Sequence, residues 1–437
     1  MKNKQVTVVG AGMAGCEAAW QLVRRGIPVR LIEMKPVRRS AAHTGDGFAE
    51  LVCSNSLKAE NLTSGSGLLK AEMKLLGSLL LECAEKARVP AGGALAVDRD
   101  LFSAEATRAL REHPLVEVEI GALEEIPEGP AIIATGPLTD APLAEAIRRE
   151  EGVDSLYFFD AAAPIVTAES LDEEKIFRAS RYGKGDGDDY INCPMDEATY
   201  RAFYEALTTA ERADVHGFEK KMVFEGCLPV EVLADRGFQT LAFGPMKPVG
   251  LVDPRTGKEP YAVVQLRREN AEGTLYNLVG FQTRLKWGEQ KRVFSMIPGL
   301  ERAEFARYGV MHRNTYLNGP QVLDKNFVWK KHPDIRFAGQ MTGVEGYMES
   351  AASGIVAGLN MARQLLGQEE VEFGSKTIIG ALEKHTRTPN DNYQPMNSNF
   401  GILDRLTERV KGKRNRYERM AQRALEEMNR IIEETGI

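Results

Sequence analysis

The sequence predicts an α/β fold, in which a Rossmann-like domain with a parallel sheet is interrupted by an inserted α+β domain. Three observations predict it. A strand, a glycine-rich turn and a helix follow one another from residue 6, a second such unit begins at residue 335, and the residues between about 155 and 300 alternate short helices and strands with polar loops. A chain of 437 residues is also too long for one ordinary core, so two or three domains are expected.

The N-terminal unit has the form of a dinucleotide site. Residues 6–9 read as a buried strand, the sequence GAGMAG follows at once, and a second strand ends at Glu33. The three glycines of such a turn allow a tight bend, close approach of a pyrophosphate, and close packing of helix on strand. The helix N-terminus attracts phosphate, and the acidic residue can accept from a ribose hydroxyl. The residues assigned to this site are Gly10, Ala11, Gly12, Met13, Ala14, Gly15 and Glu33.

The glycine turn alone does not identify the nucleotide, because sites for S-adenosylmethionine, NAD and FAD all use one. The second unit distinguishes them: a strand at residues 335–338, a turn with the sequence MTGVEGY, and a helix to residue 366. Two such units around an insertion are typical of large FAD folds of the glutathione-reductase type, so FAD is the expected cofactor. The residues assigned to it here are Gly136, which follows a strand at residues 131–134, and Gly339, Gly343, Val344, Glu345, Gly346 and Tyr347.

These units also predict the domain organisation. We expect residues 1–150 and 300–437 to form a discontinuous FAD-binding domain, and residues 151–299 to form the insertion. Residues 36–67 are polar and rich in Ser, Gly and Asn, which predicts a long loop, and loops of this length are usually functional or mobile. Residues 68–88 are predicted to be one helix, and residues 405–430 a charged helical tail.

Composition excludes several classes of protein. A hydrophobic content of 43% with 27% charged residues is that of a soluble globular protein, and no apolar stretch approaches the ~18–20 residues of a membrane helix. The N-terminus lacks the pattern of a secretory signal, so a cytoplasmic protein without a membrane partner is expected. Five scattered cysteines without a CxxC pair favour neither disulfides nor zinc, and no metal site is assigned. Since the net charge is −6, an RNA substrate would have to meet a local basic patch.

Several longer motifs resemble one family. The motifs are residues 10–17 (GAGMAGCE), 53–57 (CSNSL), 244–251 (GPMKPVGL), 311–316 (MHRNTY) and 343–354. Together they resemble the folate- and FAD-dependent tRNA (uracil-C5) methyltransferases, the TrmFO family, over nearly the whole chain. The nearest related family, the GidA-type flavoproteins that modify a wobble uridine, carries a long extra C-terminal helical domain, for which too little sequence follows the second flavin helix.

The resemblance implies C5-methylation of a T-loop uridine, position 54 of tRNA, to give ribothymidine. It implies that methylenetetrahydrofolate supplies the one-carbon unit, that reduced FAD carries methylene and hydride, and that NADPH or NADH regenerates the reduced flavin. The implied partners are the tRNA T-arm and the folate, and no obligate protein partner is evident. The alternatives are a GidA-like flavoprotein acting on another RNA uridine, a flavin oxidoreductase of small molecules, and a non-catalytic RNA-binding module.

Two cysteines suit this chemistry. C5 of uracil becomes nucleophilic once a thiolate has added at C6, so a reactive cysteine is required. Cys227, in the turn-like sequence FEGCLP, and Cys53, followed by Ser-Asn-Ser, match the two cysteines of the family pattern. We assign Cys227 as the nucleophile and Cys53 as the group on the flavin side, acting as a base or a methylene trap; the reverse assignment is the alternative. Cys16, Cys83 and Cys193 are interpreted as structural.

Two basic clusters are candidates for binding RNA phosphates. One spans residues 405–419, and the other consists of Arg284, Lys286, Lys291 and Arg292. Each is equally typical of a solvated helix face. Tyr347 and Trp287 are candidates for stacking on flavin, pterin or a base, and residues 312–313 (His-Arg) for binding a folate glutamate or a phosphate. Ordinary packing is the alternative for each of these side chains.

Overall fold

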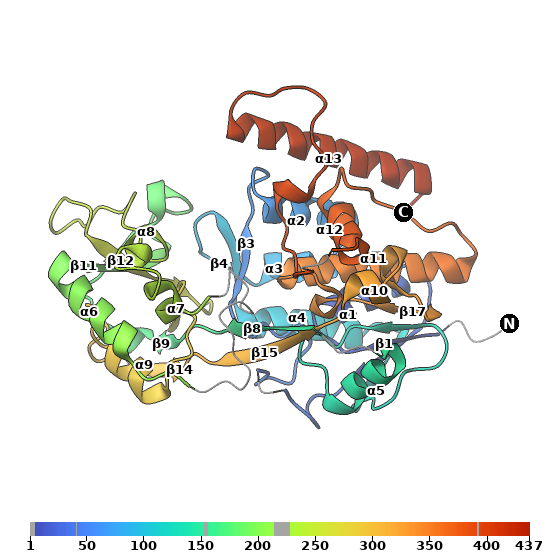
Figure 1. Ribbon diagram of the computed structural model, residues 1–437, viewed down its shortest axis with the longest axis horizontal. Coiled ribbons are helices and arrows are strands. Elements are labelled where there is room, and N and C mark those ends of the chain that lie inside the picture. The colour runs from blue at the N-terminus through green and yellow to red at the C-terminus, as the bar shows by residue number, and fades with distance from the viewer. Residues whose placement is uncertain (1–4, 41, 153–155, 214–227, 391–392) are drawn as a thin grey trace.

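The computed structural model describes residues 5–40, 42–152, 156–213, 228–390 and 393–437. Its elements gather around two sheets of different kinds, one mainly parallel and one antiparallel, with a two-stranded ribbon between them (Figure 1). The predicted α/β class with an inserted α+β unit is confirmed by this arrangement.

The larger body is built on a six-stranded sheet with the order β16-β17-β7-β1-β2-β6. Neighbouring strands pair in parallel except for β16, which pairs antiparallel with β17. The strands are β1 Val6–Val9, β2 Val29–Glu33, β6 Val116–Ile120, β7 Ala131–Ile133, β16 Val328–Trp329 and β17 His332–Phe337. Because β17, β7 and β1 are parallel neighbours, the loops that follow them meet at one edge of the sheet, which is where open α/β sheets bind ligands.

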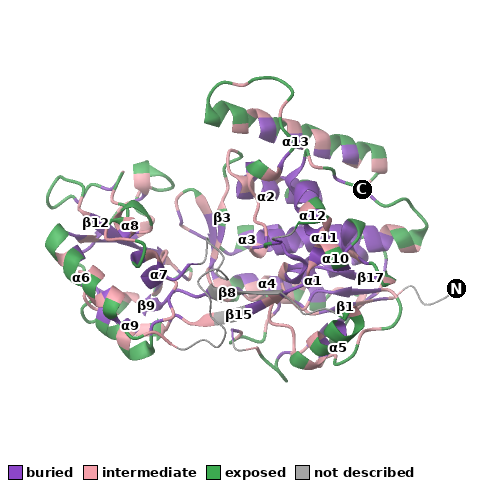
Figure 2. Ribbon diagram, in the orientation of Figure 1, coloured by how far each residue is buried: buried purple, intermediate pink, exposed green. Residues whose placement is uncertain are grey.

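Two helices, α1 Met13–Val23 and α11 Tyr347–Leu366, pack against each other in the centre of this body, where the buried residues concentrate (Figure 2). A Cβ at Gly354 would lie 2.1 Å from the carbonyl oxygen of Ala14, and one at Gly358 would lie 2.5 Å from that of Ala18. These two glycines of α11 therefore allow its backbone to touch the backbone of α1. The first glycine unit and the second are thus held together by direct helix contact.

The rest of this body surrounds that pair. Its other helices are α2 Gly65–Leu75, α3 Leu79–Lys86, α4 Arg99–Arg111, α5 Ala141–Glu151, α10 Gly319–Val322, α12 Ile378–Arg387 and α13 Lys413–Thr435. A three-stranded antiparallel sheet consists of β3 Ser56–Ala59, β4 Arg88–Val89 and β5 Ala94–Val97. The described helices include none that is long and apolar enough to cross a membrane.

The smaller body has an antiparallel sheet with the order β10-β11-β12-β13-β9-β14 and its own apolar core. Its strands are β9 Ile165–Thr167, β10 Phe177–Arg178, β11 Tyr190–Met195, β12 Ala262–Arg268, β13 Leu275–Leu278 and β14 Phe305–Arg307. Its helices are α6 Glu197–Thr209, α7 Val230–Ala234, α8 Thr240–Phe243 and α9 Trp287–Phe294. Its core side chains lie between residues 166 and 303.

Two paired strands join the bodies. The chain leaves the larger body through β8 Leu156–Ala161 and returns through β15 Met311–Tyr316. The two strands run antiparallel and stay in register from one end, where residue 156 faces residue 316, to the other, where residue 161 faces residue 311.

Three predictions of local structure are wrong. Residues 68–88 are two helices, because Gly77 adopts φ +68° after α2 and the hydroxyl of Ser78 accepts from the backbone of Leu81 to begin α3. The predicted loop at 36–67 contains β3 and the start of α2. The C-terminal helix begins at Lys413, after a glycine with φ +84°, and not at residue 405. In each case local turn chemistry decides the boundary.

Candidate functional site

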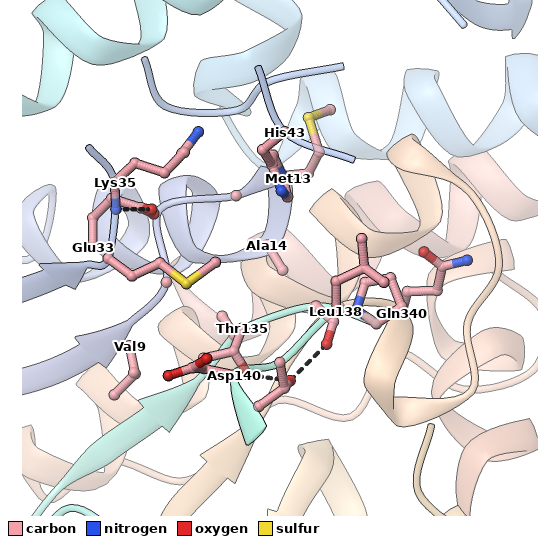
Figure 3. A pocket seen from close by; sticks show the side chains of 18 of the residues that line it. Val9, Met13, Ala14, Glu33, Lys35, His43, Thr135, Leu138, Asp140 and Gln340 are labelled. Carbon is pink, nitrogen blue, oxygen red and sulfur yellow. Dashed lines mark hydrogen bonds between the residues drawn. The ribbon is translucent and has the colours of Figure 1, made fainter. Parts of the chain in front are cut away.

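A cavity of about 1100 Å³, partly open to solvent, lies where β1, β7 and β17 end (Figure 3). Five segments line it: the β1–α1 turn, the segment after β2 (residues 34–52, called the strap), the loop after β6 (residues 121–123), the loop after β7, and the turn between β17 and α11. Of the residues predicted to bind the cofactor, the structure places these in its wall: Gly10, Gly12, Met13, Ala14, Glu33, Gly136, Gly339 and Tyr347. The remaining ones, Ala11, Gly15, Gly343, Val344, Glu345 and Gly346, are not among the residues that line it.

The first glycine turn has a different requirement at each glycine. Gly10 adopts φ +94°, and a Cβ there would lie 2.7 Å from the carbonyl oxygen of Ala134. A Cβ at Gly15 would lie 1.8 Å from the carbonyl oxygen of Gly10, so this glycine lets α1 rest on the turn. At Gly12 nothing lies within 4 Å of the Cβ position, because that side faces the cavity. The first and third glycines serve the fold, and the second leaves room for a ligand.

Two helices present their N-termini to the cavity. Gly12 precedes α1 and Gly346 precedes α11, and neither helix has a side-chain cap. The cavity wall includes the first residues of both helices, Met13 and Tyr347. Uncapped N-termini offer free N–H groups and a positive dipole end, which suit a pyrophosphate or an electron-rich ring oxygen.

The carboxylate of Glu33 organises the first turn from the end of β2. One oxygen accepts from the backbone N–H of Ala11 at 2.8 Å and the other from that of Lys35 at 3.0 Å. The side chain is buried yet lines the cavity. It therefore fixes the turn, and its remaining lone pairs face the space where a ribose would lie.

The second glycine turn is held from outside the cavity. Gly343 adopts φ +94°, and a Cβ there would lie 1.9 Å from the hydroxyl of Tyr393. Glu345 donates its backbone N–H to the carbonyl of Met396 at 2.8 Å, and Met396 in turn donates to Gly343. Val344 is buried. These residues shape the turn without lining the cavity, and this supporting segment at 393–396 was not predicted.

The strap after β2 contributes side chains to the cavity wall that were not predicted from the sequence. Lys35 donates to the carbonyl of Gly47 at 2.6 Å and to the carboxylate of Glu50 at 3.2 Å. His43 bonds the hydroxyl of Ser40 at 2.6 Å, and burial together with nearby Lys35 lowers the pKa of this histidine. Lys35, His43 and Glu50 all line the cavity. The sequence indicated these residues only indirectly, because the long polar segment that contains most of them was expected to be functional or mobile.

Cys53 lies at the rim of this cavity, next to the lining residue Val52. The hydroxyl of Tyr347 accepts from the backbone N–H of Cys53 at 2.8 Å and lies 3.0 Å from its sulfur. Burial and the neighbouring cysteine raise the pKa of Tyr347, so its hydroxyl stays protonated and can donate to that sulfur. The first residue of α11 therefore connects the cavity to Cys53.

A buried polar cluster surrounds the Cys53 segment and binds it to the smaller body. The guanidinium of Arg267 donates to Asn55 and to Ser54, both at 2.9 Å, and the amide of Asn55 donates to the carbonyl of Arg268 at 2.9 Å. Arg99, at the start of α4, pairs with Glu269. Arginines near the thiol provide an electropositive setting. None of these partners was predicted, because α4 and the end of β12 are far from Cys53 in sequence.

The other cysteines differ from Cys53 in exposure. Cys16, Cys83 and Cys193 are buried, and burial raises the pKa of each thiol, that of Cys83 to about 12. They agree with the structural role expected for them. Cys227 lies outside the described residues, as do the side chains of residues 312–313.

FAD fits the cavity. The open side of Gly12 leaves space for a pyrophosphate, and the N-terminus of α1 faces that space. Glu33 stands where the adenosine ribose of such a cofactor is held, and the N-terminus of α11 with Tyr347 lies at the opposite turn. Among the described residues, no group of His, Cys, Asp and Glu could hold a metal ion.

The two basic clusters lie on the surface. In the C-terminal cluster Arg414 pairs with Glu418 at 2.9 Å and Arg419 with Glu408 at 3.0 Å. In the other, Arg292 pairs with Glu289 at 2.6 Å. Exposed pairs of this kind are weak and can be exchanged for phosphate contacts.

Comparison with known proteins gives consistent similarities. The family model described as glucose inhibited division protein A matches residues 5–369. Relatives with the name methylenetetrahydrofolate–tRNA-(uracil-5-)-methyltransferase TrmFO are similar to the chain in sequence. The relative from Listeria monocytogenes is 56% identical over 433 residues, 99% of this chain and 100% of the relative. The relative from Enterococcus faecalis is 53% identical over 432 residues, 99% of each chain.

Among solved structures, GidA of Aquifex aeolicus superposes with a TM-score of 0.69 at 15% identity. The match covers 98% of this chain and 76% of that one. At this level of identity the similarity shows a common fold.

Proposed function

The chain belongs to the glucose inhibited division protein A family and, within it, to the TrmFO methyltransferases, and from this premise we propose that it methylates C5 of a uridine in tRNA with methylenetetrahydrofolate as the carbon donor and FAD as cofactor. The observation that carries the proposal is identity above half over 99% of the chain, insertion included, with the flavin cavity intact. The finer assignment is uridine 54 of the T-loop, giving ribothymidine, with NADPH or NADH as the reductant, in the cytoplasm.

The flavin-binding residues have distinct tasks. Gly12 and the first turn of α1 bind the pyrophosphate, Glu33 the ribose, and the N-terminus of α11 the flavin ring. When bound and reduced, FAD would carry the carbon unit that methylenetetrahydrofolate donates and would supply the hydride that completes the methyl group. Gly136 and Gly339 border the same cavity and keep its wall free of side chains.

The uracil itself is activated by a thiol. We assign Cys227 as the nucleophile: its thiolate adds to C6, and the electron pair of the C5–C6 bond moves to C5, which can then form a bond to carbon. A base removes the proton from C5, and the thiolate leaves C6 with the electrons it brought. Cys53, on the flavin side with Tyr347 beside it, is assigned as that base or as the trap for the methylene.

Covalent capture tests this assignment. A T-arm minihelix with 5-fluorouridine at position 54 lacks the C5 proton, so the adduct to C6 should accumulate and migrate with the protein on a denaturing gel. Cys227→Ala should abolish the adduct. Cys83→Ala is the matched control, because that thiol is buried and has a raised pKa. An unchanged adduct in Cys227→Ala would remove Cys227 from this role.

A labelled-folate assay tests the reaction as a whole. Label from methylenetetrahydrofolate should enter tRNA, and S-adenosylmethionine should not replace the folate. A flavin oxidoreductase of small molecules, the competing function, would oxidise a nicotinamide cofactor without transferring label to any RNA.

A further inference from the structure

Three aromatic rings form a continuous stack on the smaller body. Phe305 and Tyr308 lie with ring centroids 5.1 Å apart and planes 11° apart, and Tyr308 and Trp287 lie 5.6 Å and 14° apart. We call these three residues the aromatic shelf. Trp287 is its outermost ring and is 63% exposed. With Tyr308 covering one face, the other face of the indole is turned toward solvent.

A shelf of this form has the geometry of a stacking site for a nucleobase. Aromatic pairs inside proteins favour tilted and edge-on contacts as well as stacked ones, whereas here three near-parallel rings end in an exposed indole. An unpaired base of RNA stacks on such a ring without regard to its hydrogen-bonding edge. Stacking on Tyr308 already orients the indole, which lowers the cost of ordering it on binding.

The charges beside the shelf favour an anionic partner. Lys291 is exposed on α9, the helix that begins with Trp287. Lys286, immediately before it, pairs with Glu211 at 2.7 Å in an exposed ion pair, which phosphate can replace.

The shelf is also connected to the reaction centre. Arg307, between the two inner rings of the shelf in sequence, is half-buried and pairs with Ile165 in the β14–β9 ladder, and among the described residues its guanidinium has no hydrogen bond or ion pair. Burial first, and Arg99 second, lower the pKa of Arg307, while Tyr347, Glu269 and Glu50 oppose that shift. The charge of Arg307 is thus near those of Arg99, Glu269 and Glu50, so its guanidinium lies on the side of the shelf nearer the flavin cavity and is available to a phosphate.

We propose that the aromatic shelf binds an unpaired base of the RNA substrate, with Arg307 holding a backbone phosphate between that base and the target uridine. The proposal rests on the RNA methyltransferase function above and adds the place where the loop of the substrate is held. The base beside the target would stack on Trp287 while the target enters the space between Cys53 and the flavin cavity.

The test combines two protein variants with an abasic scan of the RNA. T-arm minihelices are made with a single abasic nucleotide at each loop position in turn, and their affinity is measured by fluorescence anisotropy for the flavin-bound enzyme. Trp287→Ala should weaken binding of the unmodified minihelix about 5- to 100-fold. One abasic position should weaken wild-type binding by a similar factor and have no further effect in Trp287→Ala, which is the signature of a direct pair.

Three controls separate stacking from other roles. Trp287→Phe should restore most of the affinity, because a smaller ring still stacks. Phe243→Ala removes an aromatic side chain that is 74% exposed elsewhere on the same body and should leave binding unchanged. The KM for methylenetetrahydrofolate should stay constant in Trp287→Ala while the KM for RNA rises.

Distinct results would overturn the inference. Binding of RNA by Trp287→Ala at wild-type affinity, or the absence of any coupled abasic position, would refute it. A raised KM for the folate with normal RNA affinity would assign the shelf to the pterin instead. Failure of the wild-type enzyme to transfer label to any RNA would refute the proposed function, a result that none of the shelf outcomes can produce.

Discussion

Two pairs of helix N-termini in the larger body contrast with each other. At α3 and α12 a buried glutamate from elsewhere closes the end: Glu17 accepts from the backbone N–H groups of Leu79 and Leu80 at 3.2 and 3.0 Å. Glu72 accepts from the first two N–H groups of α12, both at 2.9 Å. At α1 and α11 there is no side-chain cap, and both ends face the cavity.

This contrast shows which helix ends are left for a ligand to complete. A buried N–H group without a partner costs about 1–3 kcal/mol, so a protein closes a helix end internally wherever it can. Leaving two ends open at one cavity makes sense only when a ligand completes them. The glycines of the two turns keep side chains away from the open ends of α1 and α11, and the two carboxylates keep the ends of α3 and α12 closed.

Substitution of the glycines in the turn before α1, one of the two open helix ends, should have the largest effect. Gly12→Ala should leave the unfolding free energy of the flavin-free protein within about 0.5 kcal/mol, because nothing lies near the Cβ position, yet lower FAD affinity more than about 100-fold. Gly15→Ala should lose stability as well, by about 1–3 kcal/mol or more, because its Cβ meets the backbone of Gly10. Flavin absorbance and urea denaturation measure the two quantities. Equal stability losses in both variants would contradict the distinction.

A smaller effect is expected from removing the glutamate that closes the N-terminus of α12. Glu72→Ala removes both acceptors of α12 and leaves two buried N–H groups, which should destabilise the protein by about 2–4 kcal/mol. Glu72→Gln, which retains one acceptor, should recover part of that loss. Chemical denaturation of the FAD-bound protein gives both values. The flavin content of the folded fraction should remain that of the wild type, and a loss of flavin would show that the two kinds of helix end are not independent.

Within one pH unit, the expected effect of pH on stability is the smallest of the three. Burial raises the pKa of Glu17 to about 7 and that of Glu72 to about 8, from an unfolded value of 4.5. Between these values the folded state binds more protons than the unfolded state, so their contribution to stability is complete below pH 4.5 and is lost as the pH rises toward 8. Each group contributes a slope of up to about 1.4 kcal/mol per pH unit. Denaturation at several pH values should show a shallower decline for Glu72→Gln, and identical slopes would contradict the raised pKa.

The open helix ends could be predicted from the sequence, because their signals are local. A glycine turn follows a strand within a few residues, so the sequence GAGMAG and the turn at residues 339–346 both predict backbone geometry directly. The closed ends could not: Glu72 and the helix it caps are about 300 residues apart, and a lone glutamate in an apolar pattern carries no sign of its partner.

The setting of Cys53 was unpredictable for the same reason. Its segment was identified by resemblance and by its following polar residues, whereas Arg99, Arg267 and Glu269 gather around it only through the tertiary fold. The break at Gly77, by contrast, had a local signal in the Gly-Ser pair that a pattern of apolar residues at helical spacing overrode.

The ribbon of β8 and β15 couples the positions of the larger and the smaller body. Both covalent crossings run as one antiparallel pair in continuous register over six residues each, so neither strand can slide without its neighbour. A single-residue deletion in either strand would turn the side chains beyond it to the opposite face. Such a deletion would therefore change the position of the smaller body and move the aromatic shelf relative to the flavin cavity, while each body still folds around its own core.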